Sequence, residues 1–264
     1  MTQTEHLQHV ILGIVKDIDA LCRENGIEYY LFGGSALGAK RHKGFIPWDD
    51  DLDIALLPAQ YDRFIEICKQ KLDKSKYTLQ EGLVDWPEHF SKIRLKGTHI
   101  REYGEYYAGK DSDGIYVDVF RVDNAAPSKM GRRVQYFLGK LWLAYNMRCK
   151  GYKSDTTAKK IMSAVAGSLH FKPLKKLVVN TYLKYNHRET GWTSDVLGRT
   201  RMHNAFIPRS VYGKAVRVPF EDTLLPVHED VDKYLRISYG DYMKLPPEDK
   251  RVGLHITEID FGKY

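Results

Sequence analysis

The sequence predicts an α/β (α+β) protein in which a small sheet is flanked by helices and a helical C-terminal half follows. Three observations predict this class. The N-terminal residues up to about Gly26 place apolar side chains at three- and four-residue steps, which is typical of an amphipathic helix. Short apolar runs bounded by polar loops follow as far as Phe120 and indicate strands. Helical periodicity then dominates from Met130 to about Asn186.

The elements can be placed in order along the chain. Thr2 and Glu5 have the spacing of a capping box and begin the first helix, which is expected to pack on the sheet. Pro58 is expected to start a helix that runs to about Leu72. Strands are expected at 27–32, 51–56, 77–80, 92–95, 115–120 and 216–220, and further helices at 130–146, 157–167, 173–186 and 229–237.

Length and composition are those of a soluble globular protein. The chain has 264 residues, of which 43% are hydrophobic and 28% are charged, and no repeat or low-complexity linker divides it. We therefore place only a soft boundary near residue 126. It separates a core at 1–126 from a helical region with a closing segment at 127–264, and a single domain is the alternative.

Cysteine usage and the N-terminus predict the compartment. Three scattered cysteines are too few for a disulfide framework or a zinc cluster, so a reducing cytoplasm is the simplest location. The N-terminus lacks a basic region and a small-residue cleavage site, and no window holds the roughly 18 apolar residues of a spanning helix. We expect a cytoplasmic protein that is neither exported nor integral to a membrane.

The stretch LFGGSALGAKRHKGFIPWDDDLDIAL, from Leu31 to Leu56, contains the first candidate site. Gly33 and Gly34 allow a tight turn after a strand, and Ser35 is expected to cap a short helix that follows. A glycine turn at a helix start presents backbone N–H groups and the positive end of the helix dipole. This turn is therefore a candidate phosphate site.

Acidic residues follow the glycine turn within an apolar strand. Side chains alternate along a strand, so Asp51 and Asp53 are expected on one face, with Leu52 and Ile54 on the other. Like charges on one face repel unless a cation neutralises them, and two carboxylates beside a phosphate site suit Mg²⁺. A solvated acidic surface is the weaker alternative, because the apolar neighbours need burial.

A third acid lies in the apolar run IYVDVF, from Ile115 to Phe120. Asp118 is its only charged residue. Burying an unpaired carboxylate is costly, so Asp118 should have a cation or strong hydrogen-bond donors beside it. Asp118 is therefore a candidate metal ligand, with a satisfied structural acid as the alternative.

The order of these motifs resembles a known family. GGS followed by RHKGFIPWDDDLDIAL, then IYVDVF and finally YGDYMKLPP at Tyr239–Pro247, is similar to the signature of the LicD/fukutin-type transferases. The likeness extends from about residue 25 onward and is loosest between Pro127 and Val216. It implies a nucleotidyltransferase (DNA polymerase β-like) core with a small mixed sheet.

The resemblance implies a Mg²⁺-dependent phosphotransferase, with Mn²⁺ as the alternative ion. A phospho-alcohol headgroup, phosphocholine in the bacterial members, would move from a CDP-alcohol to a sugar hydroxyl, and CMP would leave. The acceptor would be a cell-surface glycan such as lipopolysaccharide or teichoic acid, or its lipid-linked precursor. Asp51, Asp53 and Asp118 would hold the ion and form the catalytic group, with Asp49 and Asp50 in support, and Asp118 would accept the hydroxyl proton. Transfer of ribitol phosphate or glycerol phosphate, and nucleotidyl transfer, are alternatives for the same site.

Cations near these motifs are candidates for binding the phosphates of the donor. Two of them match the family motif directly after the glycine turn, two alternate with apolar residues on one strand, and two lie in the closing segment. A solvated charge run is the alternative for the first pair. The candidates are Arg41, His42, Lys92, Arg94, Arg251 and His255.

Basic charge is concentrated in one segment. Lys129–Arg188 contains 14 Lys or Arg and one acid, so its net charge is +13, whereas the whole chain carries +7. The segment also contains apolar residues such as Phe137, Trp142, Leu169 and Leu177. Peripheral contact with the anionic inner face of a membrane is one expectation. A packed core with a solvated basic exterior is the alternative.

A nucleic-acid-binding protein without catalysis is the competing class of function. The basic segment lacks a zinc-finger, RRM or basic-zipper pattern, and such a protein has no need of three acids within strands. We therefore expect an enzyme whose partners are a CDP-alcohol donor and a sugar acceptor, without a nucleic-acid partner.

Overall fold

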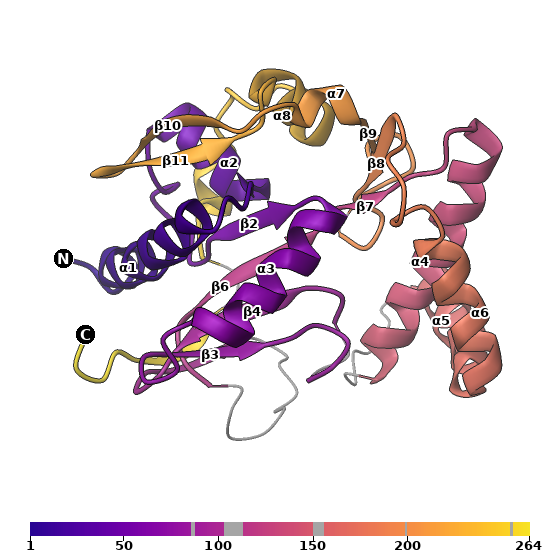
Figure 1. Cartoon of the computed structure of the whole chain (residues 1–264), viewed down its shortest axis with the longest axis horizontal. Helices are drawn as coiled ribbons and strands as arrows, with labels where there is room; N and C mark the ends of the chain where they lie inside the picture. Colours follow the sequence, from indigo (N-terminus) through magenta and orange to yellow (C-terminus); the bar gives the residue numbers. More distant parts are fainter. Residues whose placement is uncertain (86–87, 103–112, 150–155, 199, 254–255) are drawn as a thin grey trace. The chain divides into compact units, whose positions relative to one another are not determined.

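The computed structural model describes the chain except residues 86–87, 103–112, 150–155, 199 and 254–255. It contains two compact units. Unit 1 consists of Met1–Arg121 and Val211–Tyr264, and unit 2 consists of Val122–Ser210. Unit 2 is therefore an insertion between two parts of unit 1 (Figure 1). The division into a core at 1–126 and a C-terminal region at 127–264 stays a prediction. In the structure, residues 211–264 pack with unit 1.

The centre of unit 1 is a five-stranded mixed sheet with the strand order β1-β2-β6-β4-β3. The parallel pair is β2 and β6, and the other neighbours are antiparallel. The predicted α/β class, with a small sheet and helices, is confirmed at this level. The strands are β1 (Tyr30–Leu31), β2 (Asp53–Leu56), β3 (Tyr77–Gln80), β4 (Ser91–Leu95) and β6 (Tyr116–Arg121).

The helices of unit 1 begin where the sequence predicts. In α1 (Gln3–Glu24), the predicted capping box is present: the Glu5 N–H donates to Thr2 Oγ1 over 3.2 Å, and the Thr2 N–H donates to the Glu5 carboxylate over 2.6 Å. One face of α1 is buried and lies against the sheet. The other helices are α2 (Gly33–His42), α3 (Pro58–Lys71), α8 (Val231–Tyr239) and the 3₁₀ turn η3 (Glu248–Lys250), with the short α7 (Arg209–Tyr212) at the junction of the units.

Two strand pairs complete unit 1. The hairpin of β10 (Val216–Phe220) and β11 (Thr223–Val227) is antiparallel. The C-terminal strand β12 (Ile256–Asp260) pairs with β5 (His99–Glu102). The predicted strand at 216–220 is confirmed as β10, and the C-terminal half also contains β11 and β12, which were not predicted.

Unit 2 combines helices with a small sheet of β7 (Asp123–Asn124), β8 (Trp192–Ser194) and β9 (Phe206–Pro208). Its core includes the buried side chains of Trp142 and Leu169. For these two residues the packed-core alternative is confirmed, because they lie in the core between the helices. The helices are α4 (Lys129–Cys149), α5 (Thr157–Ala166), the 3₁₀ turn η2 (Gly167–His170) and α6 (Lys172–Leu183). Among the described residues, no helix has both the length and the apolar character needed to cross a bilayer.

Two local expectations around the glycine turn are wrong. Ser35 is not a cap, because α2 begins at Gly33 and its N-cap residue is Phe32. The Ser35 hydroxyl instead accepts the Asp53 N–H over 2.9 Å. Asp51 lies outside the strand, since β2 begins only at Asp53. The neighbouring strand β1 has ended there and turned into α2, so residues before Asp53 have no strand to pair with on that side.

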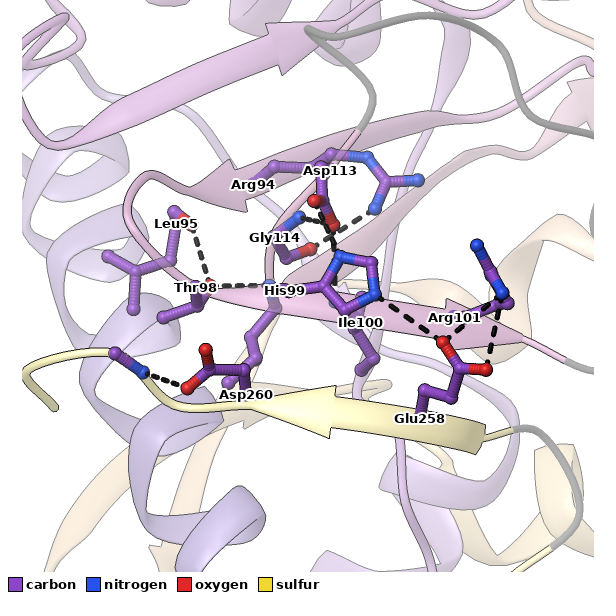
Figure 2. A network of polar contacts seen from close by, with 12 residues as sticks. Arg94, Leu95, Thr98, His99, Ile100, Arg101, Asp113, Gly114, Glu258 and Asp260 are labelled. Atoms are coloured by element: carbon purple, nitrogen blue, oxygen red, sulfur yellow. Dashed lines mark hydrogen bonds and ion pairs between the residues drawn. The ribbon is translucent and has the colours of Figure 1, made fainter.

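His99 on β5 contacts both Asp113 and a residue of β12. Its Nδ1 lies 2.7 Å from Asp113 Oδ2, and its Nε2 lies 3.8 Å from Glu258 Oε2 (Figure 2). Arg101 also contacts Glu258, at 3.2 Å. The hydrogen bond with Asp113 raises the pKa of His99 above its ordinary value.

In the wild type, the pKa of His99 should lie above its ordinary value of about 6.5. We expect Asp113→Asn to lower this pKa, and NMR titration of the imidazole measures the change. Because the pKa is raised on folding, the pair stabilises the fold fully below about pH 6.5 and loses this effect as pH rises through the folded pKa. The variant should therefore lose more stability in mildly acid than in alkaline buffer. An exposed control, Asp62→Asn, should leave the titration unchanged, and a wild-type His99 pKa at or below about 6.5 would contradict the interaction.

Candidate active site

Three of the candidate residues lie in one row across the central strands. Asp53 on β2 is in register with Asp118 on β6, and Asp118 is in register with Lys92 on β4. In-register neighbours project from the same face of a sheet, so the three side chains lie side by side. Lys92 Nζ lies 3.2 Å from Asp118 Oδ1, and both side chains are buried. The row joins two candidate acids to one candidate cation.

The carboxyl of Asp53 lies in the most acidic surroundings of this row. Burial raises its pKa well above the ordinary value, and acidic neighbours raise it further. These neighbours, in decreasing order, are Asp51, Asp118 and Asp49, whereas Lys92 lowers the pKa. Several negative charges therefore act on one partly buried carboxyl group, and a divalent cation would neutralise them.

The turn before β2 positions the other acids. Asp49, Asp50 and Asp51 each offer a carboxylate oxygen, and these oxygens lie within 4.8 Å of one another. Gln8 of α1 fixes the turn, because its side-chain amide donates to the carbonyls of Ile46 and Asp49 over 3.1 and 2.8 Å. The place of Asp51 thus depends on this turn and not on the strand alternation that the sequence predicts.

The glycine turn lies directly against these carboxylates. A Cβ atom on Gly33 would lie 3.2 Å from Asp53 Oδ2, and one on Gly34 would lie 3.0 Å from Asp49 Oδ2. Gly33 has a φ of +53°, which also favours glycine. The start of α2 therefore faces acidic oxygens, where the positive end of the helix dipole stabilises negative charge.

Two polar groups of the turn already have structural partners. The Gly33 N–H donates to the hydroxyl of Tyr234 on α8 over 3.0 Å. The Ser35 hydroxyl accepts the Asp53 N–H. Among the described residues, the structure gives the Gly34 N–H no hydrogen-bond partner. Gly34 is thus the residue of the turn best placed to donate to an anion.

The closing segment of the chain lies over the turn at Trp48–Asp50. The Ile256 N–H donates to Asp50 Oδ2 over 3.3 Å, and a Cβ atom on Gly253 would lie 3.0 Å from the same oxygen. The Arg251 guanidinium lies 5.8 Å from the centre of the Trp48 ring. Candidate residue Arg251 is therefore near the acidic turn, whereas candidate His255 lies outside the described residues.

Arg94 and Lys92 differ although they share one strand. The buried Arg94 donates from Nη1 to the Gly114 carbonyl over 3.1 Å (Figure 2). Its Nε also donates to Gln80 Oε1 over 2.8 Å. Arg94 thus stabilises the sheet and the turn at Gly114. Lys92 is the cation of this pair that contacts a candidate acid.

Arg41 and His42 lie at the end of α2 away from the glycine turn. Arg41 donates from Nε to His42 Nε2 over 2.9 Å and from Nη1 to the Tyr242 carbonyl over 2.7 Å. Partial burial, and then the charge of Arg41, lower the pKa of His42. The His42 ring lies edge-on to Trp48, with 6.3 Å between the ring centres. Binding of donor phosphates by these two residues stays a prediction.

Sequence reasoning missed Tyr234 and gave Asp49 only a supporting place. The periodicity of the 229–237 segment predicts that Tyr234 faces inward, but no local pattern connects this helix to Gly33. Asp49 stands in the same run as Asp51, and only the structure shows its carboxylate against Gly34. Both contacts depend on tertiary packing.

The ligands that the acidic site offers to a metal ion are carboxylate oxygens. Its carboxylates come from Asp51, Asp53 and Asp118, with Asp49 beside them. Hard cations such as Mg²⁺ and Mn²⁺ prefer carboxylate oxygens. The mutual repulsion around Asp53 also favours a bound cation. The residues present therefore fit a divalent metal ion.

Comparison with known proteins relates this site to a family. The model of the LicD/FKTN/FKRP family, nucleotidyltransferase domain, matches residues 26–146, which include the glycine turn and all the acids. The chain is 29% identical to the lipopolysaccharide cholinephosphotransferase LicD of Haemophilus influenzae over 265 residues, which cover 95% of each chain.

Shorter stretches match two uncharacterized proteins. One, from Rickettsia prowazekii, is 30% identical over 106 residues, which cover 29% of this chain and 40% of that protein. The other, from Rickettsia typhi, is 42% identical over 57 residues, which cover 22% of this chain and 18% of that protein. The family domain at residues 26–146 and the near full-length likeness to LicD agree with the resemblance that the motifs indicate, and they support a phosphotransferase enzyme.

Proposed function

We propose that this phosphotransferase moves phosphocholine from CDP-choline to a sugar hydroxyl of lipopolysaccharide, or of its lipid-linked precursor, and releases CMP. The relative from Haemophilus influenzae is a cholinephosphotransferase of lipopolysaccharide by name. The observation that carries the proposal is the convergence of carboxylates on Asp53 beside the start of α2. The three free cysteines favour a cytoplasmic location.

Unit 1 is proposed to be a nucleotidyltransferase (DNA polymerase β-like) core. The description of the matched family domain supports this assignment, and so does the mixed five-stranded sheet with acids on two adjacent strands. The fold of unit 2 is outside this proposal, since the family domain ends at residue 146.

The acids and Lys92 are proposed to hold the metal ion, accept a proton and balance charge during the transfer. Asp51, Asp53 and Asp118 would hold Mg²⁺ or Mn²⁺, and the ion would supply charge neutralisation for the diphosphate and the departing CMP. Asp118 is proposed to accept the proton of the attacking sugar hydroxyl. The ammonium of Lys92, 3.2 Å from Asp118 Oδ1, offsets part of the negative charge of the row.

The donor is proposed to lie between the glycine turn and Trp48. Gly34 can donate its N–H to a phosphate oxygen at the positive end of α2. Arg251 near Trp48 is a candidate for the nucleotide phosphate, as are Arg41 and His42 at the other end of α2. Lys92 is favoured over Arg94, because Arg94 is held by Gln80 and Gly114.

Product analysis tests the proposal against its alternatives. The protein is incubated with Mg²⁺, a lipopolysaccharide acceptor and either CDP-choline, CDP-ribitol or CDP-glycerol, and CMP is measured. CMP release with choline on the acceptor supports the proposal. Release with only CDP-ribitol or CDP-glycerol assigns another alcohol to the same site. In a parallel incubation with CTP, release of pyrophosphate with the cytidine monophosphate group left on the acceptor would identify a nucleotidyltransferase instead.

Replacing any one of Asp51, Asp53 and Asp118 by Asn should reduce turnover in this assay by roughly a hundredfold or more. An amide keeps the shape of the side chain but loses the charge that holds the ion. In EDTA, Asp53→Asn should also raise the melting temperature, since it removes a partly buried carboxyl that acidic neighbours repel. Asp62→Asn on the exposed face of α3 is the matched control and should change neither quantity. Wild-type turnover in a variant would remove that residue from the site.

CDP should bind more tightly in Mg²⁺ than in EDTA, because the acids repel a diphosphate unless a cation lies between them. CMP has one phosphate and should gain less from the metal. Isothermal titration calorimetry measures both dissociation constants. Equal affinities for CDP with and without metal would contradict a shared metal and diphosphate site.

Tyr234→Phe should destabilise unit 1 by about 1–3 kcal/mol, since it leaves the Gly33 N–H without its acceptor. It should also reduce turnover, because Gly33 lies against the Asp53 carboxylate. Urea unfolding measures the first effect and the CMP assay measures the second. Tyr264→Phe removes a hydroxyl at the C-terminus and serves as the control. An unchanged unfolding midpoint would show that the hydrogen bond contributes little.

A further inference from the structure

The helices of unit 2 expose apolar side chains that do not serve the core. Trp142 and Leu169, which close that core, are almost wholly buried. In contrast, the side chains of Phe137, Val165 and Leu177 are 62%, 53% and 64% exposed. Exposed apolar side chains that gather on one region mark interaction sites more often than single ones do. These side chains therefore point to a binding surface.

The exposed apolar residues follow stripes on the helices. On α4, Met130, Val134 and Phe137 are four and three residues apart and thus share one face. On α5, Ile161 and Val165 share a face in the same way. The two helices lie against each other, and α4 also packs on α6 (Figure 1). Each of these neighbouring helices thus exposes apolar side chains.

Exposed cations flank these apolar side chains along the helices. Arg133 lies beside Val134 on α4, Lys160 precedes Ile161 on α5, and Lys176 precedes Leu177 on α6. The segment that contains these helices carries 14 Lys or Arg and one acid. Apolar side chains set among cations form the pattern of a surface that enters the headgroup region of an anionic bilayer.

We propose that the outer faces of α4, α5 and α6 bind an anionic lipid surface. A second copy of this chain is a poor occupant, because two surfaces with the same large positive charge would repel each other. Nucleic acid is also a poor occupant, since stacking platforms for bases use aromatic side chains and this surface is mostly aliphatic. Anionic headgroups complement the cations, and the acyl boundary complements the apolar stripes.

The contact is peripheral and reversible. No described helix is able to cross a bilayer. Each basic residue near an anionic leaflet strengthens partitioning by about fivefold at low salt. Four such residues together amount to a factor on the order of several hundred. The apolar side chains add a part of the affinity that salt does not screen.

Vesicle sedimentation of the full chain tests the proposal. The protein is mixed with vesicles of phosphatidylcholine alone or of phosphatidylcholine with phosphatidylglycerol, and the bound fraction is measured after centrifugation. Raising NaCl from about 0.1 M to about 1 M shortens the Debye length from about 10 Å to about 3 Å. We expect strong sedimentation with the anionic vesicles at low salt, and a loss of at least tenfold in affinity at high salt.

Two variants separate charge from apolar contact, and each has a matched control in unit 1. The charge variant should lose about a hundredfold or more in affinity, and the apolar variant should lose binding at both salt concentrations. The charge variant combines Arg133→Glu, Lys160→Glu, Lys172→Glu and Lys176→Glu, and its control combines Lys74→Glu, Lys214→Glu, Lys233→Glu and Lys263→Glu. The apolar variant combines Phe137→Ser, Val165→Ser and Leu177→Ser, and its control combines Val84→Ser, Leu224→Ser and Val252→Ser.

The outcomes are distinct. All the replaced residues are exposed, so the melting temperatures of the variants should stay near that of the wild type. Absence of sedimentation with anionic vesicles at low salt would overturn the proposal, as would equal losses in the variants and their controls. Salt-sensitive binding of duplex DNA or RNA without vesicle binding would identify a nucleic-acid surface instead. The assay contains no donor nucleotide, so its result does not depend on the proposed transfer reaction.

Discussion

The register of β2, β6 and β4 is the constraint on which the site depends. A shift of β6 by one residue would turn Asp118 to the opposite face and place a valine beside Asp53. Val117 and Val119 project from that opposite face, and both are fully buried. Burial of these apolar side chains therefore fixes the position of the acid between them. The chemistry on one face of the sheet is held by packing on the other.

The row places several carboxylates close together on one face of the sheet, which is unfavourable without compensating positive charge. The carboxylates around Asp53 disfavour each other's ionised form, and burial adds to the cost. Unit 1 offsets part of it with Lys92 within the row and with the N-terminus of α2 beside the row. The repulsion that these two groups leave uncompensated would favour the binding of a cation. The affinity of the site for a metal ion therefore depends on the architecture of the sheet.

Local signals in the sequence predicted much of this fold. The capping box at Thr2 and Glu5, the strand at 77–80 and the helix that starts at Pro58 all occur where expected, because each depends on neighbouring residues. The place of Asp51 was wrong, because β1 ends early and leaves it without a strand partner. The contact of Tyr234 with Gly33 joins residues 201 positions apart, and no pattern within either segment contains it. The ion pair of Lys92 with Asp118 likewise requires knowledge of strand order.

The insertion of unit 2 sets the order in which a growing chain can assemble the site. The strands that carry Asp53, Asp118 and Lys92 all precede residue 122 and leave the ribosome early. Tyr234 and the backbone amide that binds Asp50 follow only after unit 2 has been made. The residues of the acidic row are thus synthesised before the residues that contact the glycine turn and Asp50. A chain terminated before α8 would lack the Tyr234 hydroxyl that accepts the Gly33 N–H, so the glycine turn would lose that support.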